Sequence, residues 1–166
     1  MREALWRQLG AAVDMLGNAI AAFPDEVWLD PARRPPPWHL AYHTLFFLDL
    51  YLSPGLDGFA PPAPFTLSEL DPSGVLPERP YTRAELLAYL DHGRRKARST
   101  LAGLTDEAAA RPVSFPWVGE MSFGELLLVS LRHVQHGAAQ LNLILRQTVD
   151  AAPEWVKRAA EGLDGG

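Results

Sequence analysis

The sequence predicts an all-α fold in which four long helices form a bundle. Apolar residues recur at helical spacing in four blocks, and helix-start signals precede two of these blocks. No stretch shows a convincing alternation of apolar and polar residues, which is the pattern of a half-buried strand. Because amphipathic helices bury their apolar faces against one another, a four-helix bundle is the expected arrangement.

The first helix is predicted over residues 2–22, where an amphipathic stripe of apolar residues runs to Phe23. Pro24 ends this helix, because proline cannot continue it. The prolines at 35–37 lead into the second helix, predicted over residues 38–52, and proline is tolerated in the first turn of a helix. The second block is apolar almost all round, so we expect it to be a buried helix.

A long crossover, residues 53–80, separates the second helix from the third and contains seven prolines. Connections of this length without regular structure are uncommon in compact domains and are usually functional or disordered. Apolar residues are spaced along this one and can anchor it to the bundle. We therefore expect an ordered, proline-rich crossover that lies across the helices, with one short turn near residues 68–70.

Capping boxes mark the starts of the third and fourth helices. In the first box, Thr82 and Glu85 satisfy first-turn amides reciprocally, which predicts a helix over residues 82–104. Ser122 opens an equivalent box, and the apolar stripe that follows it predicts a helix over residues 122–147.

Three shorter segments complete the chain. Residues 105–107 can cap one further short turn, and residues 113–121 are expected to be extended or to form a turn. A short tail helix is predicted over residues 153–162. The length suits a single domain, residues 1–166, and 48% hydrophobic residues are enough to form its core.

Composition excludes several classes of protein. The chain has no cysteine, so a disulfide, a thiolate nucleophile and a cysteine-ligated metal site are excluded. A net charge of −5 argues against nucleic-acid binding. No run approaches the roughly 18 consecutive apolar residues of a membrane span, and the N-terminus lacks the apolar stretch of a signal peptide. We therefore expect a cytoplasmic protein with no nucleic-acid or membrane partner.

Four of the five histidines fall in the two most apolar helices. His39 and His43 are four residues apart on the second helix, and His133 and His136 are three residues apart on the fourth, so each pair shares a helix face. Helical bundles build metal sites from such side chains, and neutral imidazole is a common ligand of divalent metals. A histidine on an apolar helix is also often a packing residue, so spacing alone leaves both alternatives open.

Two segments carry a more specific pattern. Residues 38–47 read WHLAYHTLFF, and residues 132–141 read RHVQHGAAQL. Together with the four helices and the long crossover, they resemble the DinB/YfiT superfamily of damage-inducible-type four-helix proteins. The resemblance implies an up-down-down-up four-helix bundle that is usually a homodimer. It also implies a metal site formed by one histidine of the second helix and a His-x-x-x-His pair of the fourth.

The resemblance places the second-helix ligand on His43 and the first fourth-helix ligand on His133. The third family position is Gly137 in this chain, and His136 lies one residue earlier. The candidate metal ligands are therefore His43, His133 and His136. Two alternatives stay open: a two-histidine site completed by water or by His39, and no metal at all.

By the same resemblance, the expected cofactor is a divalent metal ion, and imidazole ligands suit nickel, zinc, iron or manganese. The expected activity is that of a metal-dependent transferase or hydrolase. It would transfer a low-molecular-weight thiol to a small electrophile, or hydrolyse that electrophile. The alternative is a non-catalytic, stress-induced, dimeric binding module whose metal site is degenerate or absent. The sequence does not identify catalytic residues.

Overall fold

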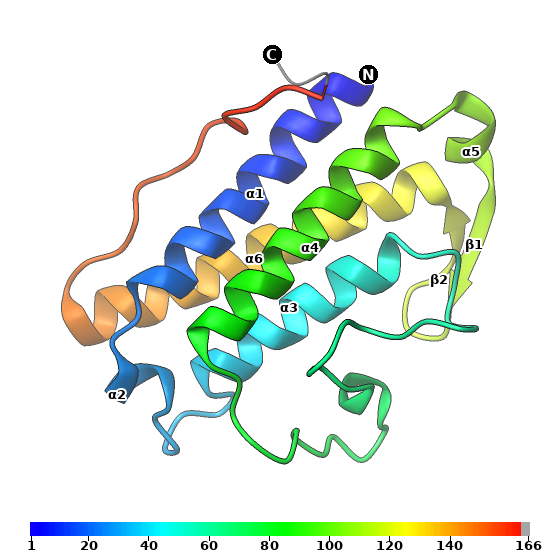
Figure 1. Ribbon diagram of the computed structural model, residues 1–166. Helices are drawn as coiled ribbons and strands as arrows, with labels where there is room; N and C mark the ends of the chain where they lie inside the picture. The colour runs from blue at the N-terminus through cyan, green and yellow to red at the C-terminus, as the bar shows by residue number, and fades with distance from the viewer. Residues whose placement is uncertain (164–166) are drawn as a thin grey trace.

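Four long helices form the body of the computed structural model, which describes residues 1–163 (Figure 1). They are α1 (Arg2–Ala22), α3 (Pro37–Tyr51), α4 (Arg83–Ala102) and α6 (Phe123–Val149). Helices α1 and α3 each pack against both α4 and α6. The chain is mostly helical, as the sequence predicts, and each long helix begins and ends within two residues of its expected range. Within the described residues, none of the helices combines the length and the apolar character needed to cross a membrane.

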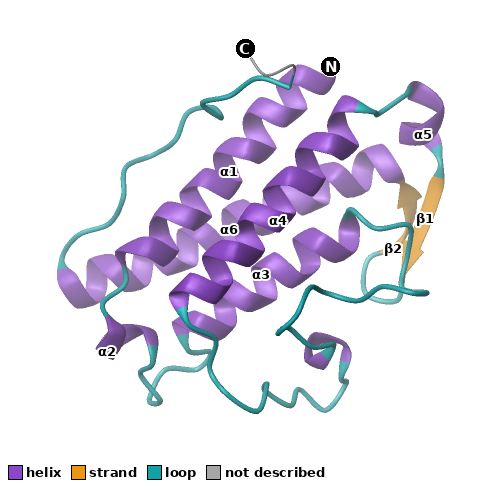
Figure 2. Ribbon diagram, viewed as in Figure 1, coloured by secondary structure: helices purple, strands orange, loops and turns teal. Residues whose placement is uncertain are grey.

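Short elements connect the long helices (Figure 2). Helix α2 (Asp25–Trp28) follows α1, the 3-10 turn η1 (Ser68–Leu70) lies in the crossover, and α5 (Asp106–Ala110) follows α4. Strands β1 (Pro112–Phe115) and β2 (Gly119–Ser122) pair as an antiparallel hairpin directly before α6. The sequence predicts only an extended or turn segment here, because four-residue strands are too short to show a clear alternation.

Helix α3 is the most buried helix of the bundle. Pro36 precedes it and Pro37 occupies its first position, where a missing N–H breaks no helical hydrogen bond. Thirteen of its fifteen residues are buried, and the two that are not are His39 and His43. Helix α3 is therefore open to solvent only along the face that carries its two histidines.

Aromatic contacts and hydrogen bonds fasten the crossover, residues 53–80, to the bundle. The ring of Phe65 stacks on Tyr89 of α4, with ring centroids 4.3 Å apart. The hydroxyl of Tyr42 on α3 donates to the backbone carbonyl of Thr66 at 2.5 Å. These contacts lie just before η1 in the chain, and they hold this turn beside α3.

The C-terminal tail corrects one expectation from the sequence. Residues 151–163 do not contain the helix expected over residues 153–162; they form an extended strap that runs back along α1 (Figure 1). The backbone amide of Ala159 donates to the carbonyl of Arg7 at 2.9 Å. Because backbone groups of the strap pair with other parts of the chain, they are not available to one another for helical hydrogen bonds.

Candidate functional site

A cavity of about 280 Å³ lies between α3 and α6, and we call it the histidine pocket. His39 and His43 line it from α3, and His133 and His136 line it from α6. The complete lining is Pro35, His39, Leu40, His43, Thr44, His133, His136, Gly137 and Gln140. A more open depression of about 540 Å³ along α6 also includes His133 and His136. The fold thus brings the three candidate ligands to the wall of one cavity.

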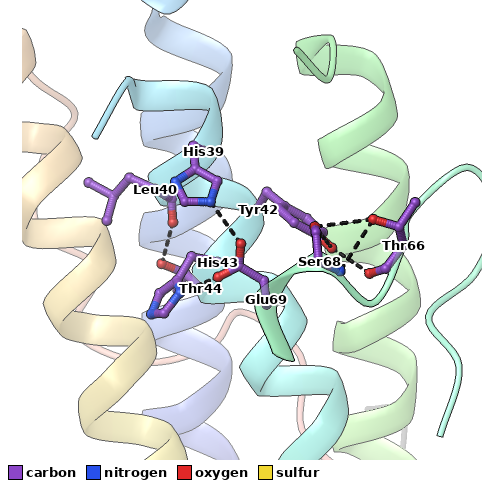
Figure 3. A network of polar contacts seen from close by, with 8 residues as sticks. All are labelled: His39, Leu40, Tyr42, His43, Thr44, Thr66, Ser68 and Glu69. Carbon is purple, nitrogen blue, oxygen red and sulfur yellow. Dashed lines mark hydrogen bonds and ion pairs between the residues drawn. The ribbon is translucent and has the colours of Figure 1, made fainter. Parts of the chain in front are cut away.

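A carboxylate from the crossover binds both α3 histidines (Figure 3). Glu69 of η1 accepts a hydrogen bond from Nε2 of His39 at 2.7 Å and another from Nδ1 of His43 at 2.5 Å. Its side chain is only 7% exposed. Sequence reasoning misses this residue: it predicts the short turn at residues 68–70, but nothing in the sequence links that turn to the histidines.

The geometry makes Glu69 an ionised acceptor. Burial by itself raises the pKa of this carboxyl group, but the hydrogen bonds from His39 and His43 outweigh burial and hold the pKa of Glu69 at about 2. A carboxylate only accepts hydrogen bonds, so the ring nitrogens that face it carry protons. In neutral His43 the proton therefore lies on Nδ1, and the lone pair of Nε2 is free.

His133 is the counterpart of His43 on α6. Its ring centroid lies 5.2 Å from that of His43 and 5.7 Å from that of Phe47. Burial, with a smaller contribution from the neighbouring His43 imidazole, lowers the pKa of His133 to about 4, so this imidazole is neutral at neutral pH. Its Nε2 is buried and has no hydrogen-bond partner among residues 1–163. An unsatisfied buried polar atom costs about 1–3 kcal/mol, so a ligand that pairs with this nitrogen would be stabilised.

The third family position does not accommodate a side chain in this structure. A Cβ atom placed on Gly137 would clash with Oγ1 of Thr44 and would lie 2.8 Å from its Cγ2. Thr44 is fixed there, because its hydroxyl donates to the carbonyl of Leu40 at 2.7 Å (Figure 3). His136, the alternative third ligand, is exposed. Over residues 1–163, no three His, Cys, Asp or Glu side chains are grouped so that they could hold a metal ion.

Comparison with known families identifies the chain. Residues 8–141, well over half of its length, match the model of the DinB superfamily. The chain belongs to the DinB superfamily. No curated protein matches it. Both segments that carry the resemblance, residues 38–47 and 132–141, lie inside the matched range, and membership of the DinB superfamily confirms that resemblance.

In this DinB-superfamily member the histidine pocket therefore differs from the three-histidine pattern expected from the resemblance. The imidazoles of His43 and His133 are adjacent. That of His43 is held in one orientation by Glu69, and that of His133 is neutral at neutral pH. Thr44 fills the space beside the position where a third histidine is expected. Glu69 adds a buried carboxylate that orients one of the two imidazoles.

Proposed function

We propose that the histidine pocket binds one divalent metal ion through His43 and His133, with His136 as the third candidate ligand. The observation that carries the proposal is that one ring nitrogen of His43 and one of His133 are both available to bind a ligand. Glu69 leaves the Nε2 lone pair of His43 free, and the Nε2 of the neighbouring His133 is buried without a partner among the described residues. A metal-binding histidine usually donates its other ring N–H to a carboxylate or a carbonyl, and Glu69 accepts that hydrogen bond from His43.

The residues of the pocket fit two ligand positions and leave others open. Position 137 supplies no side-chain ligand, because it is glycine, and Thr44 fills the adjacent space. His136 lines the pocket but is exposed, so its imidazole would have to turn inward to serve as a ligand. A site with few protein ligands keeps positions for water or substrate, which is typical of catalytic rather than structural metal sites.

The chemistry of such a site follows from its charge. When bound, a divalent ion lowers the pKa of a water or thiol that it coordinates and polarises an electrophile. Glu69 holds the His43 ring in one orientation, and His39 binds the other carboxylate oxygen, so neither side chain is free to rotate. We therefore propose a metal-dependent enzyme that hydrolyses a small electrophile or transfers a low-molecular-weight thiol to it.

A non-catalytic binding module is the second candidate function. The contact between Thr44 and Gly137 favours it, because that contact closes the third ligand position. In this case the histidines serve packing and hydrogen bonding, and the protein is a stress-induced, dimeric module. Both candidate functions include the two expectations that come from the resemblance: a homodimer and an up-down-down-up order of the helices.

Elemental analysis of untagged protein, purified without chelator, separates the two functions. His43→Ala and His133→Ala are compared with His92→Ala, a matched variant on α4 outside the pocket. We expect near-stoichiometric nickel, zinc, iron or manganese in the wild type and in His92→Ala. We expect none in the two pocket variants, with unchanged helical circular dichroism in all four proteins.

Two results would contradict the metal proposal and favour the binding module. One is a wild type that contains no metal and binds none of the four when they are added. The other is full metal retention in both His43→Ala and His133→Ala. His136→Ala decides the third ligand, because loss of metal in this variant would mean that the exposed histidine turns inward.

A further inference from the structure

A second cavity, of about 260 Å³, adjoins the histidine pocket, and we call it the arginine pocket. Its lining is Arg33, Arg34, Pro35, Leu40, Gln140, Leu143 and Ile144. Three of these residues, Pro35, Leu40 and Gln140, also line the histidine pocket. A small molecule that extends past these three residues can therefore contact imidazoles with one end and guanidinium groups with the other.

The two guanidinium groups keep hydrogen-bonding capacity. Nε of Arg33 is buried and has no hydrogen-bond partner among residues 1–163, and the Oδ2 atom of Asp30 lies 3.7 Å from it. Nη1 of Arg34 donates to the carbonyl of Arg33 at 3.0 Å and to the carbonyl of Pro31. A guanidinium group has five N–H donors, so both side chains retain donors for a ligand.

Apart from Asp30, whose carboxylate pairs with Arg33, little negative charge opposes an anion at this place. The α6 sequence that faces the two pockets contains no Asp or Glu between Glu125 and Asp150. Glu69, the carboxylate nearest to the α3 histidines, is already paired with both of them. A ligand anion in the arginine pocket would therefore meet two guanidinium groups, and it would compete with Asp30 for that of Arg33.

The start of α3 adds to the positive potential. This fifteen-residue helix has no side-chain cap and no acidic residue in its first turn. Pro35, which lines both pockets, lies two residues before its first helical residue, Pro37. The N-terminal end of a helix carries a partial positive charge and favours anions placed near it.

The rest of the arginine pocket is apolar. Leu40, Leu143 and Ile144 form its walls, and Leu143 is 52% exposed although it is a large hydrophobic residue. Such walls suit a short hydrocarbon segment, whereas an inorganic anion would leave them in contact with water.

We propose that the arginine pocket binds the carboxylate of a small organic acid, whose apolar stem lies on Leu40, Leu143 and Ile144 and whose far end reaches the histidines. A planar carboxylate accepts two hydrogen bonds from a guanidinium group, which fits Arg33 and Arg34. The assignment rests on the proposed function of the histidine pocket and names its substrate class: a short-chain carboxylate with a reactive group at the opposite end.

Binding of hexanoate to the full-length, chelator-treated protein tests the assignment. Amide chemical shifts in a ¹H–¹⁵N spectrum are followed with hexanoate, with neutral hexanamide and with inorganic phosphate. We expect saturable shifts at Gln140 and Leu143, and an affinity for hexanoate about tenfold above that for hexanamide, because a charge-assisted hydrogen bond is lost in the amide. The preference should vanish in the Arg33→Gln/Arg34→Gln variant and persist in Arg95→Gln, an exposed control on α4.

Equal affinities for hexanoate and hexanamide in the wild type would overturn the assignment, as would a preference that survives in the double arginine variant. If phosphate binds as tightly as hexanoate, the proposal that the apolar walls bind a hydrocarbon stem would be contradicted. Because these titrations use metal-free protein, their outcome does not depend on whether the histidine pocket binds a metal ion. A carboxylate preference together with no metal binding would leave the arginine pocket assigned and the metal centre rejected.

Discussion

Thr44 on α3 occupies the space that any side chain at position 137 of α6 would need. Its methyl carbon lies 2.8 Å from the place of a Cβ on Gly137, and its hydroxyl is tied to the carbonyl of Leu40 at 2.7 Å. Glycine at 137 therefore allows the two helices to approach closely here. The glycine at the position where the resemblance leads us to expect a third histidine is therefore also the residue that allows α3 to pack closely on α6.

Gly137→Ala should destabilise the protein by about 1–3 kcal/mol, because the added methyl group overpacks the contact with Thr44. Urea unfolding measures the change. In an uncrowded helix the same substitution stabilises by up to about 1 kcal/mol, so an increase in stability would contradict the close contact. Thr44→Ala combined with Gly137→Ala should recover part of the loss, since the hydroxyl and methyl groups that cause the clash are removed.

Glu69→Gln should weaken metal binding by about 10–100-fold, the usual effect of removing a carboxylate behind a metal-bound histidine. His39 and His43 donate to different oxygens of Glu69, and the amide replaces one of these oxygens by an NH2 group, which donates and cannot accept. Metal titration measures the affinity, and ¹⁵N spectra of the imidazoles in metal-free protein report the proton on Nδ1 of His43.

Glu78→Gln is the matched control for this substitution, because Glu78 lies in the same crossover and is exposed. It should change neither the metal affinity nor the His43 spectrum. An unchanged His43 spectrum in Glu69→Gln would show that the carboxylate does not determine the position of the ring proton.

Metal-free protein should lose stability as the pH falls from about 6.5 to about 4. The pKa of His133 is lowered from 6.5 to about 4 in the folded state, so the unfolded chain binds the proton first. Stability from the neutral imidazole is complete above pH 6.5, and its loss ends near pH 4. The loss is on the order of 3 kcal/mol.

Urea unfolding at several pH values in this range checks the effect, with His133→Gln as the comparison. The variant should show a shallower decline, since the group that titrates is gone. Parallel declines in the two proteins would contradict the lowered pKa of His133. Glu69 contributes in a separate, more acidic range of pH, because its pKa of about 2 lies below the ordinary value of 4.5 for a glutamate side chain.

A buried ion pair joins α3 to α4 and should respond strongly to the removal of one partner. Asp49 is 1% exposed; Nζ of Lys96 lies 2.5 Å from its Oδ1, and the hydroxyl of Tyr89 donates to its Oδ2 at 3.1 Å. Lys96→Met removes the ammonium partner of the carboxylate and leaves it only His92, at 3.4 Å, and the hydroxyl of Tyr89. The substitution should cost about 3 kcal/mol in urea unfolding, at the low end of the range for buried pairs because Lys96 is 28% exposed.

Asp49→Leu/Lys96→Met, in which both charges are replaced, should be more stable than Lys96→Met alone, because no buried charge remains. Arg95→Gln, an exposed neighbour on the same helix, should change stability by less than about 0.5 kcal/mol. A Lys96→Met variant as stable as this control would show that the ion pair contributes nothing.

Local patterns in the sequence were sufficient for the helices and for part of the site. The prolines at 35–37 and the apolar run after them predict the buried α3, and helical spacing places His43 and His133 on faces that can meet. Their adjacency at 5.2 Å agrees with this reasoning. The motif comparison also identifies Gly137 as a departure, although it does not reveal that Thr44 fills the adjacent space.

Features that depend on the path of the chain could not be predicted in the same way. The partners of Glu69 lie 26 and 30 residues away and are reached through a crossover without helical periodicity. The strap at residues 151–163 makes hydrogen bonds with α1, about 150 positions earlier, and with Arg98 of α4. These distant contacts outweighed the signal of Pro153 for a helix start.

The strap also brings the two ends of the described chain together. The amide of Leu163 donates to Oε2 of Glu3 at 3.1 Å, at the end of the bundle opposite α2 (Figure 1). A short peptide linker across this gap would allow circular permutation, with new termini opened at the exposed turn around Gly74. Such a permutant keeps every residue but cuts the covalent path from Glu69 to α4. It would show whether the contacts of Phe65 and Thr66 alone are enough to hold Glu69 against His39 and His43.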